Sequence, residues 1–448
     1  MRRNRQVDRA PLAPGAVPVL GHALRLLRDP LPWLDACRQT GPLVRVRMGP
    51  RSAHLVCCPH LVHELLMNRS FDKGGPLFDN ARELLGNGLG TSTREDHLRQ
   101  RRLMQPAFSP SHIAAYAAVM REEIAGLTDS WKGDGAVDLF PDLMSLTMRV
   151  LIRTLLPTAD PQEAEHLSTQ IRFLMAGLLF RIAVPSQVLR QLPVPGNRRF
   201  NRARAEAFAG AERIVAAARA HPERGGLLAA LMDTGAAEDG FTDEDLRDQV
   251  MTMFVGGTES TATTVAWLFH LLTLHPQVEE RLHAELDAVL AGRVATAEDL
   301  PRLPFTRNVL QETLRLYPVG WLLTRVSVTD VEFGGHRFPA GADFLFSSYL
   351  LHHDPASFPA PERFDPDRWD TPLSGDARHA HIPFSTGRRK CIGDTFALTE
   401  ATIILSAIAA HWRLRPAPGS RVRPHIGAAL APRGLRLVTE PRTPTRRG

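Results

Sequence analysis

Apolar residues recur at helical spacing along most of this chain, and the alternation typical of strands is confined to short stretches. Helical spacing predominates from Ile113 to Ala237, with breaks at proline and glycine. Further helices are predicted over residues 277–290, 306–317 and 395–412, and strands over residues 43–48 and 53–57 and within residues 321–347. The pattern therefore predicts a mainly α fold with a minor antiparallel β component.

One predicted helix is unusual in its length and in its centre. It opens at Thr242–Asp245 with a capping-box pattern and runs about 30 residues to His275, which makes it ~45 Å long. Its centre, residues 256–261, is poor helix material, because two glycines cost roughly 2 kcal/mol relative to alanine. Either this centre has a function or a close helix crossing requires small residues there.

The same pattern indicates how the chain is divided into domains. Residues 1–13 are expected to form a flexible leader, and residues 14–448 a single domain, because the helices are closely joined. Residues 71–93 form a long connection rich in glycine that also carries apolar residues, and such connections are more often functional than structural.

Composition excludes several classes of protein. The formal net charge is +6, but 51 of the 54 basic residues are arginine and no long basic block is present, so nucleic-acid binding is not expected. The four cysteines form no disulfide framework, and no uncharged apolar run approaches the ~20 residues of a membrane span. We therefore expect a cytoplasmic protein without a membrane anchor.

Residues 384–393, Phe-Ser-Thr-Gly-Arg-Arg-Lys-Cys-Ile-Gly, place Cys391 between two glycines just before a predicted helix. A thiolate that binds a metal needs backbone that can approach closely and N–H groups aimed at the sulfur, and a glycine-rich helix start provides both. The alternative is a buried cysteine in a turn.

The pattern Glu-x-x-Arg occurs twice, at Glu244/Arg247 and at Glu312/Arg315. Residues three apart lie on one helical face and can pair. The second pair precedes Arg368 in the sequence Pro-Asp-Arg-Trp, so a buried cluster of Glu312, Arg315 and Arg368 could hold the segment that leads to Cys391. The alternative is an exposed ion pair.

These motifs, in this order and spacing, resemble those of the cytochrome P450 family over almost the whole chain. The resemblance implies a cytochrome P450 fold that holds haem b between the long central helix and the C-terminal cysteine loop. Cys391 would then be the axial iron ligand. His97 and Arg101, in His-x-x-x-Arg, together with Arg325 and Arg389, match the positions that bind the haem propionates.

Gly257, Glu259 and Ser260 resemble the catalytic segment in which an acid and an alcohol deliver protons during dioxygen activation. The family usually has threonine where Ser260 stands. Serine keeps the hydroxyl but lacks the methyl group that restricts its rotamer. Oxygen activation that works but loses more peroxide is therefore expected.

The substrate pocket is expected to be apolar, so it implies a hydrophobic substrate. Its expected lining is Phe78, Leu85, Met253, Phe254, Trp321, Leu322 and Leu323. The surrounding segments resemble bacterial members of the family that oxidise terpenes, and a macrolactone or another polyketide is the alternative substrate.

By the same resemblance, a monomeric monooxygenase would receive electrons from a ferredoxin and its ferredoxin reductase. The ferredoxin would dock on Arg99, Arg102, Arg388 and Lys390. A non-catalytic protein of the same fold that recruits other enzymes is the hypothesis from another class. The presence of the acid–alcohol pair and of the Glu-Arg cluster disfavours it.

Overall fold

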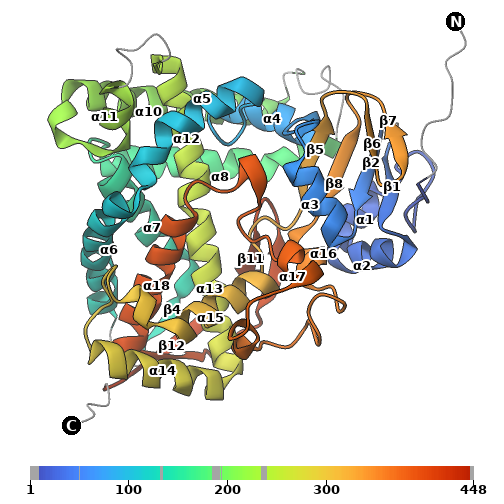
Figure 1. Cartoon of the computed structure of the whole chain (residues 1–448). Helices are drawn as coiled ribbons and strands as arrows, with labels where there is room; N and C mark the ends of the chain where they lie inside the picture. The colour runs from blue at the N-terminus through green and yellow to red at the C-terminus, as the bar shows by residue number, and fades with distance from the viewer. Residues whose placement is uncertain are drawn as a thin grey trace, which may run out of the picture.

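A body of long helices packs beside a smaller region of sheet in this computed structural model, which describes residues 10–49, 51–131, 135–183, 192, 194–233 and 240–443 (Figure 1). The largest helices are α6 (Pro110–Ser130), α7 (Leu139–Leu155), α8 (Pro161–Ala183), α10 (Pro195–Ala220), α12 (Asp243–Gly257), α13 (Glu259–Leu274), α14 (Pro276–Leu290), α15 (Pro304–Leu316) and α18 (Asp394–His411). The shorter ones are α1 (Ala23–Arg28), α2 (Pro30–Thr40), α3 (Pro59–Met67), α4 (Gly75–Leu85), α5 (Arg94–Met104), α11 (Gly226–Asp233), α16 (Ser348–His352) and α17 (Gly375–Ala380).

The main sheet has five strands in the order β1-β2-β8-β5-β3 and lies against α1 to α3. Its strands are β1 (Leu43–Met48), β2 (Arg51–Val56), β3 (Phe71–Asp72), β5 (Leu323–Ser327) and β8 (Asp343–Phe346). The remaining strands form three small sheets from β4 (Ala136–Asp138), β6 (Val331–Phe333), β7 (His336–Phe338), β9 (Trp412–Pro416), β10 (Arg423–Ile426), β11 (Leu430–Arg433) and β12 (Arg436–Pro441). The predicted fold class is confirmed, although β2 and β8 run parallel, which alternation along the chain does not reveal.

The principal core lies between the helices of the body. Met120 and Ile124 of α6, Leu143 of α7, Val265 of α13 and Ile404 of α18 have no exposed surface. Helix α13 therefore contributes to the centre of the core.

Two boundaries differ from the expectations. Residues 10–13 of the expected leader lie along β1, where Ala13 N donates to Arg45 O and Arg45 N donates to Pro11 O, and residues 1–9 lie outside the described residues. The glycine-rich connection contains helix α4, because the run from Pro76 to Leu85 has no glycine and buries Phe78, Leu84 and Leu85.

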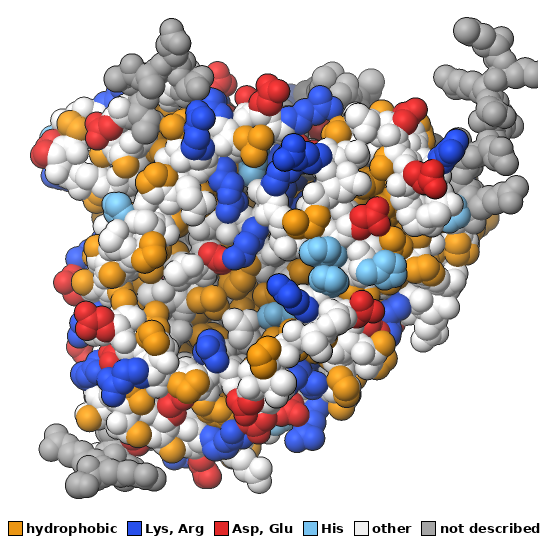
Figure 2. All heavy atoms as spheres, in the orientation of Figure 1, with side chains coloured by type: hydrophobic (Ala, Val, Ile, Leu, Met, Phe, Trp, Pro, Cys, Tyr) orange, Lys and Arg blue, Asp and Glu red, His pale blue; other side chains and the backbone are white. Residues whose placement is uncertain are grey.

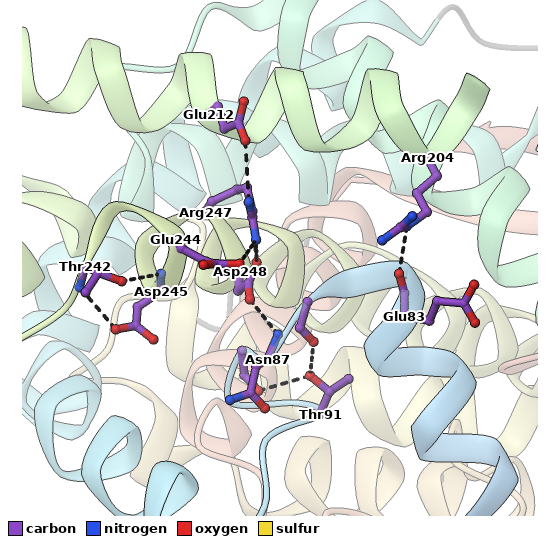
Figure 3. A network of polar contacts seen from close by, with 12 residues as sticks. Glu83, Asn87, Thr91, Arg204, Glu212, Thr242, Glu244, Asp245, Arg247 and Asp248 are labelled. Atoms are coloured by element: carbon purple, nitrogen blue, oxygen red, sulfur yellow. Dashed lines mark hydrogen bonds and ion pairs between the residues drawn. The ribbon is translucent and has the colours of Figure 1, made fainter. Parts of the chain in front are cut away.

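The capping box predicted for the long helix is present. Asp245 N donates to Thr242 Oγ1, and Thr242 N donates to the carboxylate of Asp245 (Figure 3). One turn later, Asp248 Oδ2 accepts a 2.5 Å hydrogen bond from Asn87 N. The first turns of α12 thus hold the segment between α4 and α5 over the interior.

Candidate active site

Two adjacent cavities lie between α12, the main sheet and the segment that precedes α18. Their volumes are about 420 and 390 Å³, and Phe78, Gly90, Thr252, Gly256 and Leu323 line both. The first reaches Cys391 and the charged residues around it. The second is the more apolar of the two and extends to α1 and β1.

The weak centre of the long helix is a break. Helix α12 ends at Gly257, Thr258 has φ −102° and ψ −62°, and α13 begins at Glu259. Helix α7 packs closely here, since a Cβ on Gly257 would lie 2.9 Å from Leu151 Cδ1. The small residues thus permit the close packing of α7, and Gly256 and Gly257 also line the first cavity. Both explanations offered for the weak centre of the helix therefore apply.

Ser260 lines the first cavity just after the break. Its Oγ donates a 2.6 Å hydrogen bond to the carbonyl of Gly256, one turn earlier. Glu259 is half-buried, and burial raises the pKa of its carboxyl group, an effect that Arg172 and His425 partly offset. Glu259 lines neither cavity, so of the two residues only the alcohol reaches the cavity.

The loop before α18 presents Cys391 to the first cavity. Cys391 N donates to Phe384 O at 2.9 Å, which closes the loop. Gly387 has φ +69°, and a Cβ there would lie 2.5 Å from Leu66 O, so this position requires glycine. Burial raises the pKa of the Cys391 thiol, whereas the N–H of Gly393 favours the thiolate.

The four residues expected to bind propionates all line the first cavity. His97 and Arg325 are buried, at 3% exposure each. Burial and the neighbouring cations lower the pKa of His97 to about 3 and that of Arg325 to about 10. Arg101 Nη1 donates to Lys390 O at 2.5 Å, which ties α5 to the cysteine loop.

Arg389 is oriented by the carboxylate of Asp72, which no sequence motif had indicated. Its Nε and Nη2 donate to Asp72 Oδ1 at 2.8 and 2.5 Å, and its Nη1 donates to Ser92 O at 2.8 Å. Asp72 is 7% exposed and also accepts from Arg94 N. Asp72 thus fixes Arg389 at the cavity wall.

Sequence reasoning missed Lys73, which lines the same cavity. Its Nζ donates to Gly90 O at 2.7 Å and lies 5.2 Å from the centre of the Phe78 ring. Burial, together with Arg325 and Arg389, lowers its pKa to about 7. One signal was available: Lys73 is one of only three lysines in a chain with 51 arginines, and it opens the glycine-rich connection.

The positive charge around the first cavity bears on whether the cavity can bind haem. Lys73, Arg325 and Arg389 repel one another, and the carboxylate that attracts all three is Asp72. A buried excess of positive charge is stabilised by an anion. Two propionates would supply that charge, and the thiol faces the same cavity, so the residues fit a haem whose iron is bound by cysteine.

The structure brings Glu312, Arg315 and Arg368 together. Glu312 and Arg315 have fully buried side chains and form two hydrogen bonds of 2.8 Å, and Arg368 Nε lies 3.5 Å from Glu312 Oε1. Glu312 also accepts from Asp365 N and Trp369 Nε1, and Arg315 donates to the carbonyls of His352, Pro361 and Arg363. The cluster thereby holds the segment that leads toward Cys391.

The other Glu-x-x-Arg pair is different in kind. Glu244 is 76% exposed, and Arg247, itself 15% exposed, pairs with it, with the exposed Glu212 and with the buried Asp248 (Figure 3). Context therefore distinguished the buried pair from the exposed one.

Most of the expected pocket residues line a cavity. Met253 lines the first cavity, Leu85, Trp321 and Leu322 line the second, and Phe78 and Leu323 line both. Phe254 is a correction: it is 2% exposed in the principal core and lines neither cavity. Successive residues of a helix point about 100° apart, so Met253 and Phe254 face different surroundings.

Comparison with known proteins identifies the family. Residues 11–437 match the cytochrome P450 family, to which the chain belongs. A cyclooctat-9-en-7-ol 5-monooxygenase of Streptomyces melanosporofaciens is 45% identical over 96% of this chain and 95% of its own. Cyclooctatin synthase of the same organism is 42% identical over the same shares, and pentalenene oxygenase of Streptomyces avermitilis is 40% identical over 96% and 97%. The protein is thus a cytochrome P450 monooxygenase, a family whose cofactor is a haem with a thiolate ligand.

Proposed function

We propose that this protein inserts one oxygen atom of O2 into a terpene, with Cys391 as the iron ligand. The observation that carries the proposal is one cavity that is lined by Cys391, by the basic side chains of Lys73, Arg101, Arg325 and Arg389, by the neutral imidazole of His97 and by the residues at the break between α12 and α13. The bound haem supplies oxygen activation and transfer to carbon. The residues of the chain bind the cofactor, position the substrate and move protons.

The cation cluster provides the means to hold the cofactor carboxylates. His97, Arg101, Arg325 and Lys73 present donors to the cavity, and Asp72 keeps the Arg389 guanidinium in a fixed orientation. Charge-assisted hydrogen bonds are about twice as strong as neutral ones, so contacts from the arginines and Lys73 would hold the cofactor carboxylates firmly. The N–H of Gly393 favours the thiolate form of Cys391.

Proton delivery is assigned to Ser260 and Glu259. The Ser260 hydroxyl accepts hydrogen bonds as well as donating, so it can pass a proton from a water on one side to an acceptor on the other. Glu259, with its pKa raised by burial, is able to hold a proton at the start of that path. Gly257 contributes the close contact with α7 that keeps the break in place.

The second cavity supports a hydrophobic substrate. Its lining includes Leu77, Leu85, Val255 and Trp321, and apolar surface of this kind binds by shape and burial. The relatives named above oxidise terpenes, which favours a terpene over a macrolactone. A screen of both compound classes for a low- to high-spin shift of the haem spectrum distinguishes the two.

Electron delivery is assigned to the face that carries α5 and the cysteine loop. Lys and Arg side chains gather across this face (Figure 2), and Arg102, Arg388 and Lys390 are exposed on it. Arg99 is less suited to ferredoxin docking than expected, because it pairs with Asp245 at 3.2 Å and donates to Gly240 O. A monomer that binds an acidic ferredoxin here should lose affinity as salt rises.

The carbon monoxide difference spectrum of the reduced protein tests the assignment of Cys391. A thiolate-bound haem gives a Soret band far to the red of a haem bound through imidazole. Cys391→Ser should remove that band, and Cys58→Ser, at another partly exposed cysteine, should retain it. A red-shifted band in Cys391→Ser would reject the assignment.

A further inference from the structure

One acidic side chain stands in the wall of the second cavity, which is otherwise mainly apolar. Asp343, at the start of β8, is the one aspartate or glutamate among the described residues that line either cavity. Most of the other residues that line the second cavity are aliphatic or aromatic. A polar group in such a pocket usually fixes the orientation of a ligand, so this carboxylate bears on which substrate the cavity accepts.

The main sheet directs Asp343 into the cavity. Alternate residues of a strand point to the same face, and Asp343 and Leu345 of β8 both line the second cavity. Ala53, which pairs with Asp343 on β2, and Thr324, which pairs with Leu345 on β5, line it as well. Phe344, between the two β8 residues, is fully buried in another cluster of the core. One face of the sheet thus forms a wall of the cavity.

The Asp343 carboxylate has no partner within the described part of the chain. It accepts no hydrogen bond there and forms no ion pair. Burial raises the pKa of its carboxyl group, Asp79 adds to this effect, and Arg51 and His54 partly offset it. A half-buried carboxylate without hydrogen bonds is costly, so a donor that enters the cavity would be bound favourably.

The backbone beside Asp343 leaves room for its carboxylate. Gly75, the first residue of α4, has φ +74°, and a Cβ at this position would collide with Asp343 Oδ1. Only glycine meets both conditions without strain. The nearby hydroxyl of Thr324 donates to Gly74 O at 3.4 Å and not to the carboxylate. The glycine-rich connection therefore approaches Asp343 closely without supplying a hydrogen bond.

We propose that Asp343 binds a hydroxyl group that the substrate already carries. This proposal rests on the proposed function and names the substrate class more narrowly, as a terpene alcohol and not a terpene hydrocarbon. The hydroxyl donates to the Asp343 carboxylate in the second cavity. The apolar skeleton extends past Thr252 and Gly256, which line both cavities, into the first cavity, which Cys391 lines.

The charges around the two cavities favour a neutral donor over a cationic one. Arg51 lines the second cavity, and Lys73, Arg325 and Arg389 line the first. These side chains would repel an ammonium group, whereas a hydroxyl has no net charge and still donates a hydrogen bond. The reaction that supplies the substrate has therefore already installed one oxygen, and the product carries two.

Titration of the haem spin state with matched compounds tests the proposal in the full-length holoenzyme. The compounds are the terpene alcohols cedrol, patchouli alcohol and manool. Each is compared with its methyl ether, which lacks the O–H donor, and with the hydrocarbon in which hydrogen replaces the hydroxyl. We expect the parent protein to bind alcohols about tenfold more tightly than the matched ethers and hydrocarbons, because hydrogen bonds to a charged group are among the stronger ones.

Two variants and one control assign this preference to Asp343. Asp343→Ala should reduce the preference for alcohol over hydrocarbon about tenfold and leave the affinity for hydrocarbon unchanged. Asp343→Asn should retain part of the preference, because its amide oxygen still accepts a hydrogen bond. Asp79→Ala removes a neighbouring carboxylate that is 64% exposed, and it should keep the full preference. The preference is a ratio measured within one protein, so a general loss of stability does not change it.

The outcomes distinguish failure of this proposal from failure of the proposed function. If the parent binds hydrocarbons and ethers as tightly as alcohols, or if Asp343→Ala keeps the preference of the parent, Asp343 does not bind a substrate hydroxyl, and terpene oxidation still stands. If Asp343→Ala weakens the binding of all compounds equally, Asp343 only supports the start of α4, and the proposal is also wrong. A complete lack of spin shift with every terpene would contradict the proposed function, and this proposal with it.

Discussion

The hydroxyl of Thr147 on α7 donates a 2.9 Å hydrogen bond to the carbonyl oxygen of Thr258, the residue between α12 and α13. Both residues are buried, at 0% and 3% exposure. A helix break exposes carbonyls that an unbroken helix would satisfy, and leaving one unsatisfied in the interior costs about 1–3 kcal/mol. Helix α7 thus stabilises the break that places Ser260 in the cavity.

Thr147→Val should therefore lower the free energy of unfolding by about 1–2 kcal/mol and increase the peroxide released per reducing equivalent. The change keeps the shape of the side chain and removes the donor. Thr154→Val on the same helix is the control, because the Thr154 hydroxyl bonds within α7, to Val150 O. Thr147→Ser should restore coupling. Unchanged coupling in Thr147→Val, with only stability reduced, would give Thr147 a purely structural role.

Ser260→Ala should increase peroxide release relative to product, because it removes the hydroxyl that lines the cavity. Ser260→Thr should have the opposite effect, since the added methyl group restricts the hydroxyl rotamer. Oxygen consumption, peroxide and product are measured together. If coupling in Ser260→Ala equals that of the parent, Ser260 has no part in proton delivery.

Glu312→Gln should destabilise the protein strongly, by about 3–5 kcal/mol, because it leaves the Arg315 charge buried without its partner. Chemical denaturation of the holoenzyme measures this. Glu244→Gln, in the exposed pair with Arg247, should cost less than about 1 kcal/mol. Equal losses in the two variants would contradict the difference in burial.

Lys73→Met should stabilise the protein that lacks its cofactor and should weaken retention of the cofactor once it is bound. Without haem, the variant lacks a buried cation that its neighbours repel. Its free energy of unfolding should therefore rise by about 1 kcal/mol, which corresponds to a melting temperature a few degrees higher. With haem, loss of a propionate contact should speed transfer of haem to a scavenging apoprotein. Lys390→Met, at an exposed lysine paired with Asp394, should do neither. Faster transfer in both variants would remove Lys73 from the cofactor site.

Glu400 on α18 should make stability depend on pH. It is fully buried, and burial raises the pKa of its carboxyl group to about 8, against about 4.3 in an unfolded chain. Above about pH 4.3 the unfolded state loses this proton while the folded state keeps it, so stability falls by about 1.4 kcal/mol per pH unit up to about pH 8.

Glu400→Gln removes the titrating group and keeps the shape. Its free energy of unfolding should match that of the parent near pH 4 and exceed it increasingly between about pH 5 and pH 8. Glu332→Gln, at an exposed glutamate, is the control and should stay within about 0.5 kcal/mol of the parent throughout. A constant difference between Glu400→Gln and the parent across this range would contradict the shifted pKa.

Sequence reasoning succeeded where local pattern determines structure. The capping box at Thr242, the hairpin of β1 and β2 and the helix that starts after Gly393 all follow from residues near one another in the chain. The spacing of His97 and Arg101 likewise selected two residues that line the first cavity, and their role there stays a prediction.

Prediction from the sequence failed where segments distant in the chain meet. Asp72 contacts Arg389, which lies more than three hundred residues later in the chain, and Thr147 contacts Thr258 from another helix. Neither contact can be predicted from the spacing of residues along the sequence. Phe254 was misplaced because apolar character alone does not say whether a helical residue faces a cavity or the core.

The cations around the first cavity also bear on how the protein matures in a cell. Before haem arrives, Lys73, Arg325 and Arg389 repel one another, so the freshly synthesised chain is less stable around these three residues than the finished protein. Cofactor supply and survival against proteases are thereby linked. Cells short of haem would accumulate little of this protein rather than a stock of inactive chains, and overexpression should yield more of it when a haem precursor is fed.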